Sequence, residues 1–415
     1  MEKQTDFDTI VIGGGPAGMM AAIAAARKGE KVALLEKNAS LGKKLLMTGD
    51  GRCNLTHANL NNRELASVYG KGGDFLLSTL ARFGIKETMD FFVARGVDLK
   101  TEADGRVFPK SDKAQDVLKA LINNLKENKV SILFNSEVIK IEKEKGAKLV
   151  KSVTLANGEK LLAKKYILTT GGKAMPVTGS TGDGYAYAQN LGHTIVKPQA
   201  ALVPVQIKES WIKNLSGLSF ENARISLMLD GKIIKKKEGD ILFAHFGLTG
   251  PLILDLSKEI GLAMGQGKVK LLVDLYYKKT QEQMEMIVQK LIESRPKKEL
   301  KNILSELVPV KLIPYIVYFA GVKESTLGFE VSKEAREKIV KVIKRLEFNP
   351  ISLVGFDRAM VTAGGVSLKE IDSRTMNSKI ISNLYFAGEV INLDGPCGGY
   401  NLQMCWSTGF VAGSN

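Results

Sequence analysis

Three glycines near the N-terminus have the spacing that binds a dinucleotide. Gly13, Gly15 and Gly18 form a GxGxxG pattern between the β-branched run DTIVIGG and an alanine-rich, helix-favouring segment. Glycines there allow a tight turn and let backbone N–H groups approach a pyrophosphate at a helix N-terminus. Glu36 ends the next apolar run, where a carboxylate can accept hydrogen bonds from an adenosine ribose. The pattern predicts a nucleotide-binding βαβ unit over residues 8–36; the alternative is a structural glycine turn followed by a surface glutamate.

The same motif binds FAD and NAD, and the rest of the chain favours FAD. A second GxGxxG is absent, so no separate nicotinamide domain is predicted. Near the C-terminus, LYFAGE (384–389) has the pattern of a strand that ends in a glycine and an acid, and GGYN (398–401) precedes a helical pattern. These segments fit a chain that returns to the ribityl chain and ring of a flavin, where a helix dipole would stabilise negative charge on the reduced ring. A buried strand with an ordinary turn is the alternative.

Cysteine and histidine chemistry is less defined by the sequence. Cys53 is the only cysteine near the nucleotide motif, so a dithiol pair is not predicted, and a small buried residue is favoured over a reactive thiol. His245, in FAHFGLTGP, could donate a proton near neutral pH, although a structural histidine is the alternative. The catalytic residues are therefore not assigned; His245, Arg52 and Tyr400 are the candidates. No metal site is predicted.

Several longer segments together resemble one family. The segment LGKKLLMTGDGRCNLT (41–56), with GRVFPKSDKA, TTGGKAMPVTGSTGDGYAYA, FAHFGLTGP, VTAGGVSL and LYFAGEVINLDGPCGGYN, resembles the bacterial YhiN/BaiN-type flavoproteins, also called aminoacetone-oxidase-like. The resemblance covers nearly the whole chain. It implies a Rossmann-like, glutathione-reductase-type FAD domain with an inserted β-barrel and a small helical subdomain. The sequence DGPCGG (394–399), which contains Cys397, departs locally from the family pattern.

The resemblance also implies which positions contact FAD. One group would hold the adenosine and pyrophosphate, a second would line the flavin side of the 41–56 loop, one backbone would meet the adenine, and a last group would close over the ribityl chain and ring. In that order, the residues are Gly13, Gly15, Ala17, Gly18, Glu36 and Lys37; Lys44, Arg52 and Asn54; Val138; and Gly388, Glu389, Tyr400, Asn401 and Leu402.

Hydrophobic periodicity predicts the elements that position these residues. Helical patterns occupy about 74–95 and 112–128, and Asp104-Gly105 favours a hairpin turn between them. Three β-rich runs between 130 and 170 predict a meander packed on the nucleotide-binding sheet.

The predicted organisation is an α/β fold with an α+β insert. Residues 1–194 and 354–415 form the FAD domain. Residues 195–275, which are mostly β in pattern, form a β-barrel-like insert with 348–353, and residues 276–347 form the helical subdomain.

Composition narrows the possible partners and compartments. The 59 basic and 44 acidic residues give a formal charge of +15, but the lysines are dispersed, and the densest run, Lys232–Lys237, fits a solvated hairpin arm better than a nucleic-acid surface. The polar start MEKQTDFD does not fit a signal peptide, and the small-apolar stretch Met19–Ala26 is far shorter than the ~18 residues of a membrane span. Three cysteines without a CxxC pair suit a reducing compartment. We expect a cytoplasmic protein; the oligomeric state is not predicted.

The sequence therefore predicts an FAD-dependent oxidoreductase that transfers hydride between the flavin N5 and a small organic substrate. Reduction of an enone-like carbon–carbon double bond is favoured, with NADH or NADPH as a transient electron donor. The alternatives are oxidation of an amine, as the resemblance suggests, a flavoprotein that acts on RNA, and a binding protein in which FAD is structural.

Overall fold

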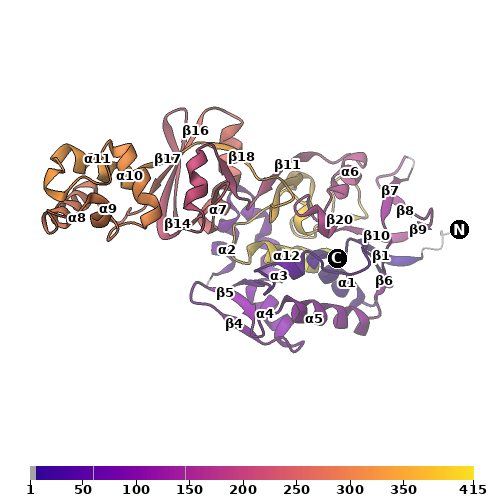
Figure 1. The fold of residues 1–415 in the computed structure, drawn as a ribbon. Coiled ribbons are helices and arrows are strands. Elements are labelled where there is room, and N and C mark those ends of the chain that lie inside the picture. The colour runs from indigo at the N-terminus through magenta and orange to yellow at the C-terminus, as the bar shows by residue number, and fades with distance from the viewer. Residues whose placement is uncertain (1–5, 59, 145) are drawn as a thin grey trace. The chain divides into compact units, whose positions relative to one another are not determined.

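The chain divides into two compact units. The computed structural model describes residues 6–58, 60–144 and 146–415. Unit 1 contains the chain up to Ala201 and again Phe356–Asn415, and unit 2 contains Leu202–Gly355. Each unit has its own hydrophobic core, and Figure 1 shows the elements in chain order. Residues 1–5, on which part of the expectation about a signal peptide rests, lie outside the described residues.

A five-stranded parallel sheet forms the centre of unit 1. Its strands follow the order β20–β10–β1–β2–β6, and every neighbouring pair is parallel. All of β2 and the last four residues of β1 are buried, as expected for a parallel sheet that is covered on both faces. The predicted βαβ unit is confirmed. The strands are β1 (Phe7–Ile12), β2 (Val32–Leu35), β6 (Ser131–Leu133), β10 (Ala163–Leu168) and β20 (Leu384–Phe386).

Among the described residues, unit 1 also contains three smaller antiparallel sheets. The predicted turn at Asp104-Gly105 is confirmed: Gly105 has φ +89°, and the strands on either side of it pair. The predicted meander is smaller than expected, because β6 and β10 at its two ends join the parallel sheet instead. The sheets contain β3 (Thr56–His57), β4 (Leu99–Thr101) and β5 (Arg106–Pro109); β7 (Val138–Lys143), β8 (Val150–Leu155) and β9 (Lys160–Leu161); and β11 (Ile195–Ala201) and β19 (Val361–Val366).

The helices of unit 1 follow the predicted periodicity with one interruption. The pattern over 74–95 forms two helices, because Phe83 leaves the helical region at φ −150° and Glu87 accepts a hydrogen bond from the Gly84 N–H (2.9 Å), which starts a new helix. The helices are α1 (Pro16–Ala26), α2 (Asn62–Val68), α3 (Leu77–Arg82), α4 (Ile85–Val93), α5 (Ala114–Glu127), α6 (Asp183–Asn190) and α12 (Tyr400–Gly413).

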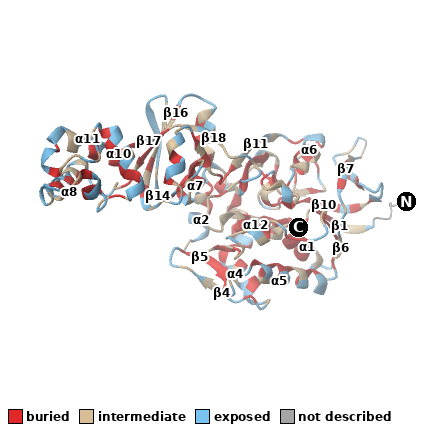
Figure 2. Ribbon diagram, viewed as in Figure 1, coloured by how far each residue is buried: buried red, intermediate tan, exposed pale blue. Residues whose placement is uncertain are grey.

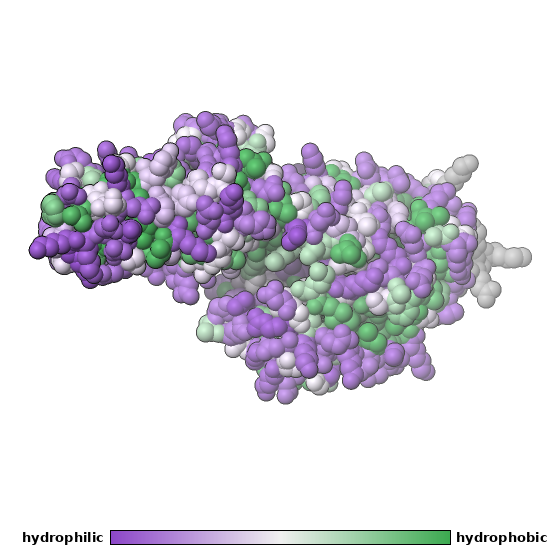
Figure 3. Space-filling model, in the orientation of Figure 1, coloured by the Kyte–Doolittle hydropathy of each residue, from purple (hydrophilic) through white to green (hydrophobic). Residues whose placement is uncertain are grey.

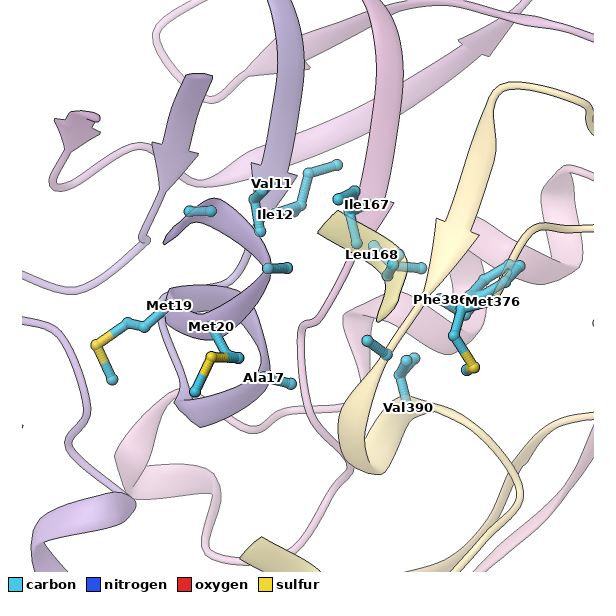
Figure 4. Packing of buried hydrophobic residues seen from close by; sticks show 14 of the residues in the cluster. Val11, Ile12, Ala17, Met19, Met20, Ile167, Leu168, Met376, Phe386 and Val390 are labelled. Atoms are coloured by element: carbon cyan, nitrogen blue, oxygen red, sulfur yellow. The ribbon is translucent and has the colours of Figure 1, made fainter. Parts of the chain in front are cut away.

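Helices α1 and α12 lie against each other through small residues, although almost the whole chain separates them. A Cβ atom added to Gly409 would lie 2.4 Å from the Ala17 carbonyl oxygen, and one added to Gly413 would lie 2.2 Å from the Ala21 oxygen. The backbones therefore touch at these two positions, which only glycine permits. Figure 4 shows residues of this core, among them Ala17 and Met20 on α1 and Ile12 and Leu168 at the ends of two strands of the parallel sheet.

Unit 2 is built on a seven-stranded antiparallel sheet with the order β17–β16–β13–β14–β15–β12–β18. Only Asn349 separates β17 from β18, so the two edge strands of the sheet are joined in the chain and the sheet must curl, as the barrel-like interpretation expects. The strands are β12 (Val205–Ile207), β13 (Ser219–Leu229), β14 (Lys232–Ala244), β15 (Gly247–Thr249), β16 (Val269–Asp274), β17 (Leu346–Phe348) and β18 (Pro350–Leu353).

One helix in this region was not predicted. The pattern over 195–275 was expected to be mostly β, but α7 (Pro251–Met264) lies within it. Pro251 occupies its first turn, and Leu252, Leu256 and Ile260 fall on one buried face at helical spacing. The continuous apolar run was ambiguous because buried strands and buried helices look alike over a few residues.

The expected helical pattern over 276–347 forms α8 (Gln281–Glu293), α9 (Leu300–Leu304), α10 (Ile313–Ala320) and α11 (Lys333–Lys344). Two of these helices begin at side-chain caps: Thr280 accepts a hydrogen bond from the Gln283 N–H, and Ser332 from the Ala335 N–H. Figure 2 shows buried residues on the inner sides of these helices.

The boundary between the units differs slightly from the predicted one. β11 pairs with β19 and so belongs to unit 1, which extends past the expected boundary at residue 194. Among the described residues, no helix is both long enough and apolar enough to cross a membrane.

Candidate functional site

The glycine turn after β1 is shaped by contacts that exclude side chains at two positions and leave a third open. A Cβ atom at Gly18 would lie 1.9 Å from the Gly13 oxygen, and one at Gly13, where φ is +108°, would lie 2.6 Å from the Thr169 oxygen. A Cβ atom at Gly15, the N-cap of α1, would meet no described atom within 4 Å. The turn is therefore closed toward the protein and open at the helix N-terminus, where a pyrophosphate could meet the backbone N–H groups and the positive end of the helix dipole.

Glu36 connects this turn to the end of β2. Its carboxylate accepts hydrogen bonds from the Gly14 N–H (2.9 Å) and from the Asn38 N–H (2.8 Å) and side-chain amide (2.7 Å). The residue is only 7% exposed. A carboxylate has about four lone-pair sites, so three of them are used and one is left for a ribose hydroxyl. Lys37 points elsewhere: its ammonium donates to Thr181 and pairs with Asp183, both at 2.6 Å.

The 41–56 loop links the glycine turn to the C-terminal segment. The Gly42 N–H donates to the Gly14 oxygen (3.1 Å), and the Lys44 ammonium pairs with Glu389 at 2.7 Å. The Asn54 amide, oriented to satisfy its neighbours, accepts from the Gly399 N–H at 3.0 Å. Three predicted cofactor residues, Lys44, Asn54 and Glu389, thus connect segments that are far apart in sequence.

Arg52 of the same loop is engaged on another side. It pairs with Glu102 at 2.8 Å, lies 3.7 Å from Asp112, and covers the Phe108 ring at 4.0 Å. The hydrogen bond to Glu102 is the main cause that raises the pKa of its guanidinium. These contacts hold the Arg52 guanidinium toward Glu102 and Phe108, and its expected place beside the flavin stays a prediction.

The segment after β20 reaches the N-terminus of α1. A Cβ atom at Gly388, where φ is +74°, would lie 2.6 Å from the Ala17 Cβ. Glu389 accepts a hydrogen bond from the Thr362 N–H (2.7 Å) while it pairs with Lys44, so the carboxylate is held from two sides. Thr362 was not predicted as a site residue, although VTAGGVSL, in which it lies, is one of the segments that carry the family resemblance.

The start of α12 is a rigid corner. Gly399 caps the helix at φ +92°, and the Asn401 side chain exchanges hydrogen bonds with the Gly395 N–H (2.9 Å) and carbonyl (2.8 Å). The Tyr400 ring stacks on His57 with ring centroids 5.3 Å apart and a 14° interplanar angle. The Tyr69 hydroxyl donates a hydrogen bond to the backbone carbonyl oxygen of Tyr400 (2.7 Å). Leu402 is buried behind this corner.

His57 and Tyr69 are neighbours of the site that were not predicted to belong to it. The Nδ1 atom of His57 is buried without a hydrogen-bond partner among the described residues. Burial raises the pKa of the Tyr69 hydroxyl well above its ordinary value. Their place could not be read from the sequence, because both reach Tyr400 across more than 300 residues of chain.

Val138 and His245 are two further positions that the sequence singled out, and the structure shows what surrounds each of them. The Val138 carbonyl, at the start of β7, accepts a hydrogen bond from the Tyr187 hydroxyl, whose pKa burial raises to about 12. His245 is exposed at the turn between β14 and β15 in unit 2, with its ring edge against Phe246 at 4.9 Å. His245 belongs to unit 2, and its catalytic role stays a prediction.

Cys53 is a buried structural residue in this region. It has no solvent exposure, its φ is +63°, and burial raises its pKa to about 12. A thiol in this environment stays protonated at neutral pH and is a poor nucleophile. The geometry agrees with the packing role that the sequence favoured.

The arrangement suits one elongated ligand with a diphosphate. Gly15 leaves room at a helix N-terminus, Glu36 keeps an acceptor for a ribose, and the contacts from Gly14 through Lys44 and Glu389 continue to Gly399 and Tyr400 within unit 1. FAD contains a diphosphate and an adenosine ribose, so the open Gly15 turn and Glu36 fit that part of it. The site can hold the cofactor at both ends, and the α12 N-terminus would favour negative charge near it.

Comparison with known proteins gives a match over nearly the whole chain. The model of the family described as HI0933-like protein Rossmann domain matches residues 7–415. A 3-dehydro-bile acid delta(4,6)-reductase of Clostridium scindens is 32% identical over 407 residues, with 97% of each chain covered. A ribosomal RNA dihydrouridine synthase of Haemophilus influenzae is 30% identical over 406 residues, again with 97% of each chain covered.

Solved structures share the fold at low sequence identity. A 3-ketosteroid-Δ4-(5α)-dehydrogenase of Rhodococcus jostii RHA1 has a TM-score of 0.54 at 14% identity and covers 100% of this chain and 99% of its own. A flavocytochrome c3 fumarate reductase has a TM-score of 0.53 at 17% identity and covers 99% of this chain and 78% of its own. The predicted α/β fold with a glutathione-reductase-type FAD domain is confirmed.

Proposed function

The chain belongs to the HI0933-like Rossmann-domain family and is an FAD-dependent oxidoreductase, and from this premise we propose that it reduces a carbon–carbon double bond conjugated to a carbonyl group. The observation that supports the proposal is the set of contacts within unit 1 that links the open Gly15 turn, through the Lys44–Glu389 pair, to Gly399 at the start of α12, next to Tyr400.

The names of two relatives support this reaction class. The Clostridium scindens enzyme is named a reductase of double bonds at positions 4 and 6 of a 3-dehydro bile acid, and a double bond at position 4 is conjugated to a ketone at position 3. The Haemophilus influenzae enzyme is named for dihydrouridine, in which the uracil double bond next to a carbonyl is saturated. Both reactions add hydride to the carbon remote from a carbonyl and a proton to the carbon beside it.

The residues of this chain would bind the cofactor, orient it and manage the proton. When bound, FAD supplies the hydride, and NADH or NADPH is the donor that we expect to replenish it. The Gly13–Gly18 turn would hold the diphosphate and Glu36 the ribose. The rigid Asn401 corner would fix the Tyr400 ring beside the substrate. The Tyr400 hydroxyl is the group that we propose as the proton source, since hydroxyl groups can transfer protons over hydrogen-bond distance.

The decisive experiment follows the colour of the cofactor. Purified protein is reduced anaerobically with NADH or NADPH and then mixed rapidly with a 4-en-3-one steroid, with aminoacetone, or with uridine-containing RNA. We expect bleaching near 450 nm by a nicotinamide and prompt recovery with the enone. In a separate arm, oxidised protein is mixed with the amine without any nicotinamide. Bleaching in this arm would instead establish amine oxidation. A flavin that never changes colour would mean a structural cofactor and would refute the proposal.

An RNA substrate is the second candidate. The charge of +15 and the 30% identity to a ribosomal RNA enzyme favour it, because a basic protein attracts a polyanion. In the same experiment, recovery of colour by the RNA and not by the enone would favour this candidate, and the uracil double bond would then be the reduced group.

A further inference from the structure

A group of aromatic side chains lies on the surface of unit 2. Trp211 stacks on Tyr315 with ring centroids 4.5 Å apart and an interplanar angle of 23°, and it also contacts Phe319 at 5.7 Å. Phe319 in turn contacts Tyr318 at 5.3 Å. Tyr318 is 75% exposed and Phe319 is 48% exposed. Large exposed rings that lie in contact with each other mark a binding surface more often than scattered single residues do.

Cationic and hydrogen-bonding side chains accompany these rings. The 3-10 helix Ser210–Leu215 contributes Trp211, Lys213 and Asn214, and the 3-10 helix Val310–Leu312 contributes Lys311 beside Val310, which is 70% exposed. The Asn214 amide donates to the Tyr315 hydroxyl at 2.6 Å, and the Lys311 ammonium donates to the Ser216 carbonyl at 3.1 Å. We define the aromatic patch as Trp211, Lys213, Asn214, Val310, Lys311, Tyr315, Tyr318 and Phe319. Both of its charged members are positive.

Buried residues of the sheet support the aromatic patch. Phe348 of β17 contacts Trp211 at 5.4 Å and is fully buried, and it also contacts Phe243 of β14 at 5.8 Å. Trp211 is therefore fixed from below by the core of the sheet, while Tyr318 and Phe319 project from the C-terminal half of α10. A fixed platform loses little conformational entropy when a flat partner stacks on it.

We propose that this aromatic patch binds single-stranded RNA, with bases stacked on Tyr318 and Phe319 and phosphates paired with Lys213 and Lys311. Aromatic rings beside lysines on a positive surface are the combination that binds single strands without base readout. Protein interfaces also use aromatic residues, but they are depleted in lysine. Unit 2 carries 25 Lys and Arg residues against 18 Asp and Glu residues, which gives +7. The proposal goes beyond double-bond reduction, and RNA binding can be measured without any catalytic step.

Fluorescence anisotropy of the intact holoprotein tests the proposal. The probe is a fluorescein-labelled single-stranded RNA of about 12 nucleotides, a length within the usual site sizes. Tyr318→Ala should weaken binding about fivefold or more, because stacking on one base contributes ~1–3 kcal/mol. The double variant Lys213→Gln/Lys311→Gln should weaken binding and lower the slope of log K against log salt by about 1.4, at ~0.7 per phosphate on a single strand.

Matched variants on the same unit separate the patch from general effects. Phe329→Ala removes another ring, 67% exposed, from the 3-10 helix Gly328–Glu330, and Lys235→Gln/Lys236→Gln removes two charges from the hairpin arm. We expect affinity within twofold of the unchanged protein for both. Thermal melting of every variant confirms that it is folded, and Tyr318→Leu serves in place of Tyr318→Ala where the alanine variant is unfolded.

The proposal is overturned if the unchanged protein does not bind the RNA, or if the patch variants and the control variants bind it equally. A change of oligomeric state on Tyr318→Ala, with RNA binding unaltered, would show that a second copy of the chain covers the patch and would overturn it too. The enone assay is run in parallel on the same preparations. Its failure with RNA binding intact would refute the proposed reduction alone, and the reverse result would refute the RNA surface alone.

Discussion

At the scale of single residues, different glycines of the turn serve the fold and the proposed cofactor site. Gly15 has open space where a side chain would go, so Gly15→Val should leave the protein folded and remove only the room for the diphosphate. We expect loss of bound FAD with a melting temperature of the apoprotein within a few degrees of that of the unchanged apoprotein. The absorbance ratio at 280 and 450 nm after purification measures the cofactor content.

The control for this change is Gly18→Val. A side chain there meets the Gly13 carbonyl, so the apoprotein itself should be destabilised or insoluble. Equal cofactor content in Gly15→Val and the unchanged protein would contradict the assignment of this turn to the diphosphate.

Glu36 has both a structural and a proposed binding role. Its carboxylate holds the Gly14 and Asn38 N–H groups, and hydrogen bonds to a charged group contribute ~1.5–3 kcal/mol each. Glu36→Gln, which keeps one acceptor oxygen, should weaken FAD binding about tenfold, and Glu36→Arg should abolish it. Titration of the apoprotein with FAD, followed by quenching of flavin fluorescence, gives the dissociation constants. A yellow Glu36→Arg protein would refute the ribose assignment.

His193 makes the stability of unit 1 depend on pH. It is buried, its Nδ1 lies 3.1 Å from the Ala188 carbonyl and its Nε2 lies 2.7 Å from the Ser378 hydroxyl, and desolvation lowers its pKa below the ordinary value of 6.5. The unfolded chain therefore takes up a proton at a higher pH than the folded chain does. The contribution of neutral His193 to the free energy of unfolding should be fully present above about pH 6.5. It should decrease as the pH falls toward the pKa of His193 in the folded protein.

Urea unfolding at a series of pH values measures this dependence. His193→Gln should show a shallower loss of unfolding free energy between pH 6.5 and pH 5 than the unchanged protein. Identical slopes for the two proteins would show that other groups cause the acid sensitivity.

At the scale of elements, the site depends on how closely α1 and α12 approach. Gly409 allows its backbone to lie against the Ala17 carbonyl, so any side chain there must push the helices apart. Gly409→Val should lower the unfolding free energy by ~1–3 kcal/mol, the usual range for overpacking a core. It should also weaken FAD binding, because Gly388 packs on Ala17 at the same end of α1.

Chemical denaturation of the apoprotein separates the two effects of Gly409→Val. Gly15→Ala is the matched control, since it adds the first carbon of a side chain at the open end of α1 and should leave the unfolding free energy nearly unchanged. Unchanged stability of Gly409→Val would show that the helix contact is looser than described.

At the scale of the whole molecule, two separate cores predict that unit 2 folds alone. Its core residues all lie between 205 and 348, whereas the core of unit 1 uses residues up to 191 and from 366 onward. The ends of unit 2 are joined by the hydrogen bond from the Val354 N–H to the Pro204 oxygen (3.1 Å), so excision leaves adjacent termini. Residues 202–355 expressed by themselves should melt in one cooperative transition, which circular dichroism would record.

The balance of charge also belongs to this scale. Hydrophilic residues cover most of the face seen in Figure 3, and apolar residues appear there in separate groups. A molecule with +15 should attract polyanions at low salt whatever its specific partner is. Specific RNA binding therefore has to be judged by the patch variants and by the salt slope, not by retention alone.

Much of the fold was predictable because its signals are local. At Gly13 and Gly18 the motif is tied to a backbone angle or a close contact that only glycine accepts. The strand and helix periods of the βαβ unit follow directly in the sequence. The hairpin at Asp104-Gly105 was likewise determined by the positive φ that this pair favours. By contrast, α7 was missed because a short buried apolar run fits either a helix or a strand.

The sequence by itself determined the class of cofactor site, because its signals, the glycine spacing and the acid at the end of β2, lie close together in the chain. Only the tertiary structure decided which distant residues meet: Lys44 pairs with Glu389, Asn54 contacts Gly399, and Arg52 turns toward Glu102. Ion pairs and side-chain contacts of this kind depend on the path of the whole chain, which local propensities do not encode. The same reason explains why Trp211 and Phe319 form one surface although more than 100 residues separate them.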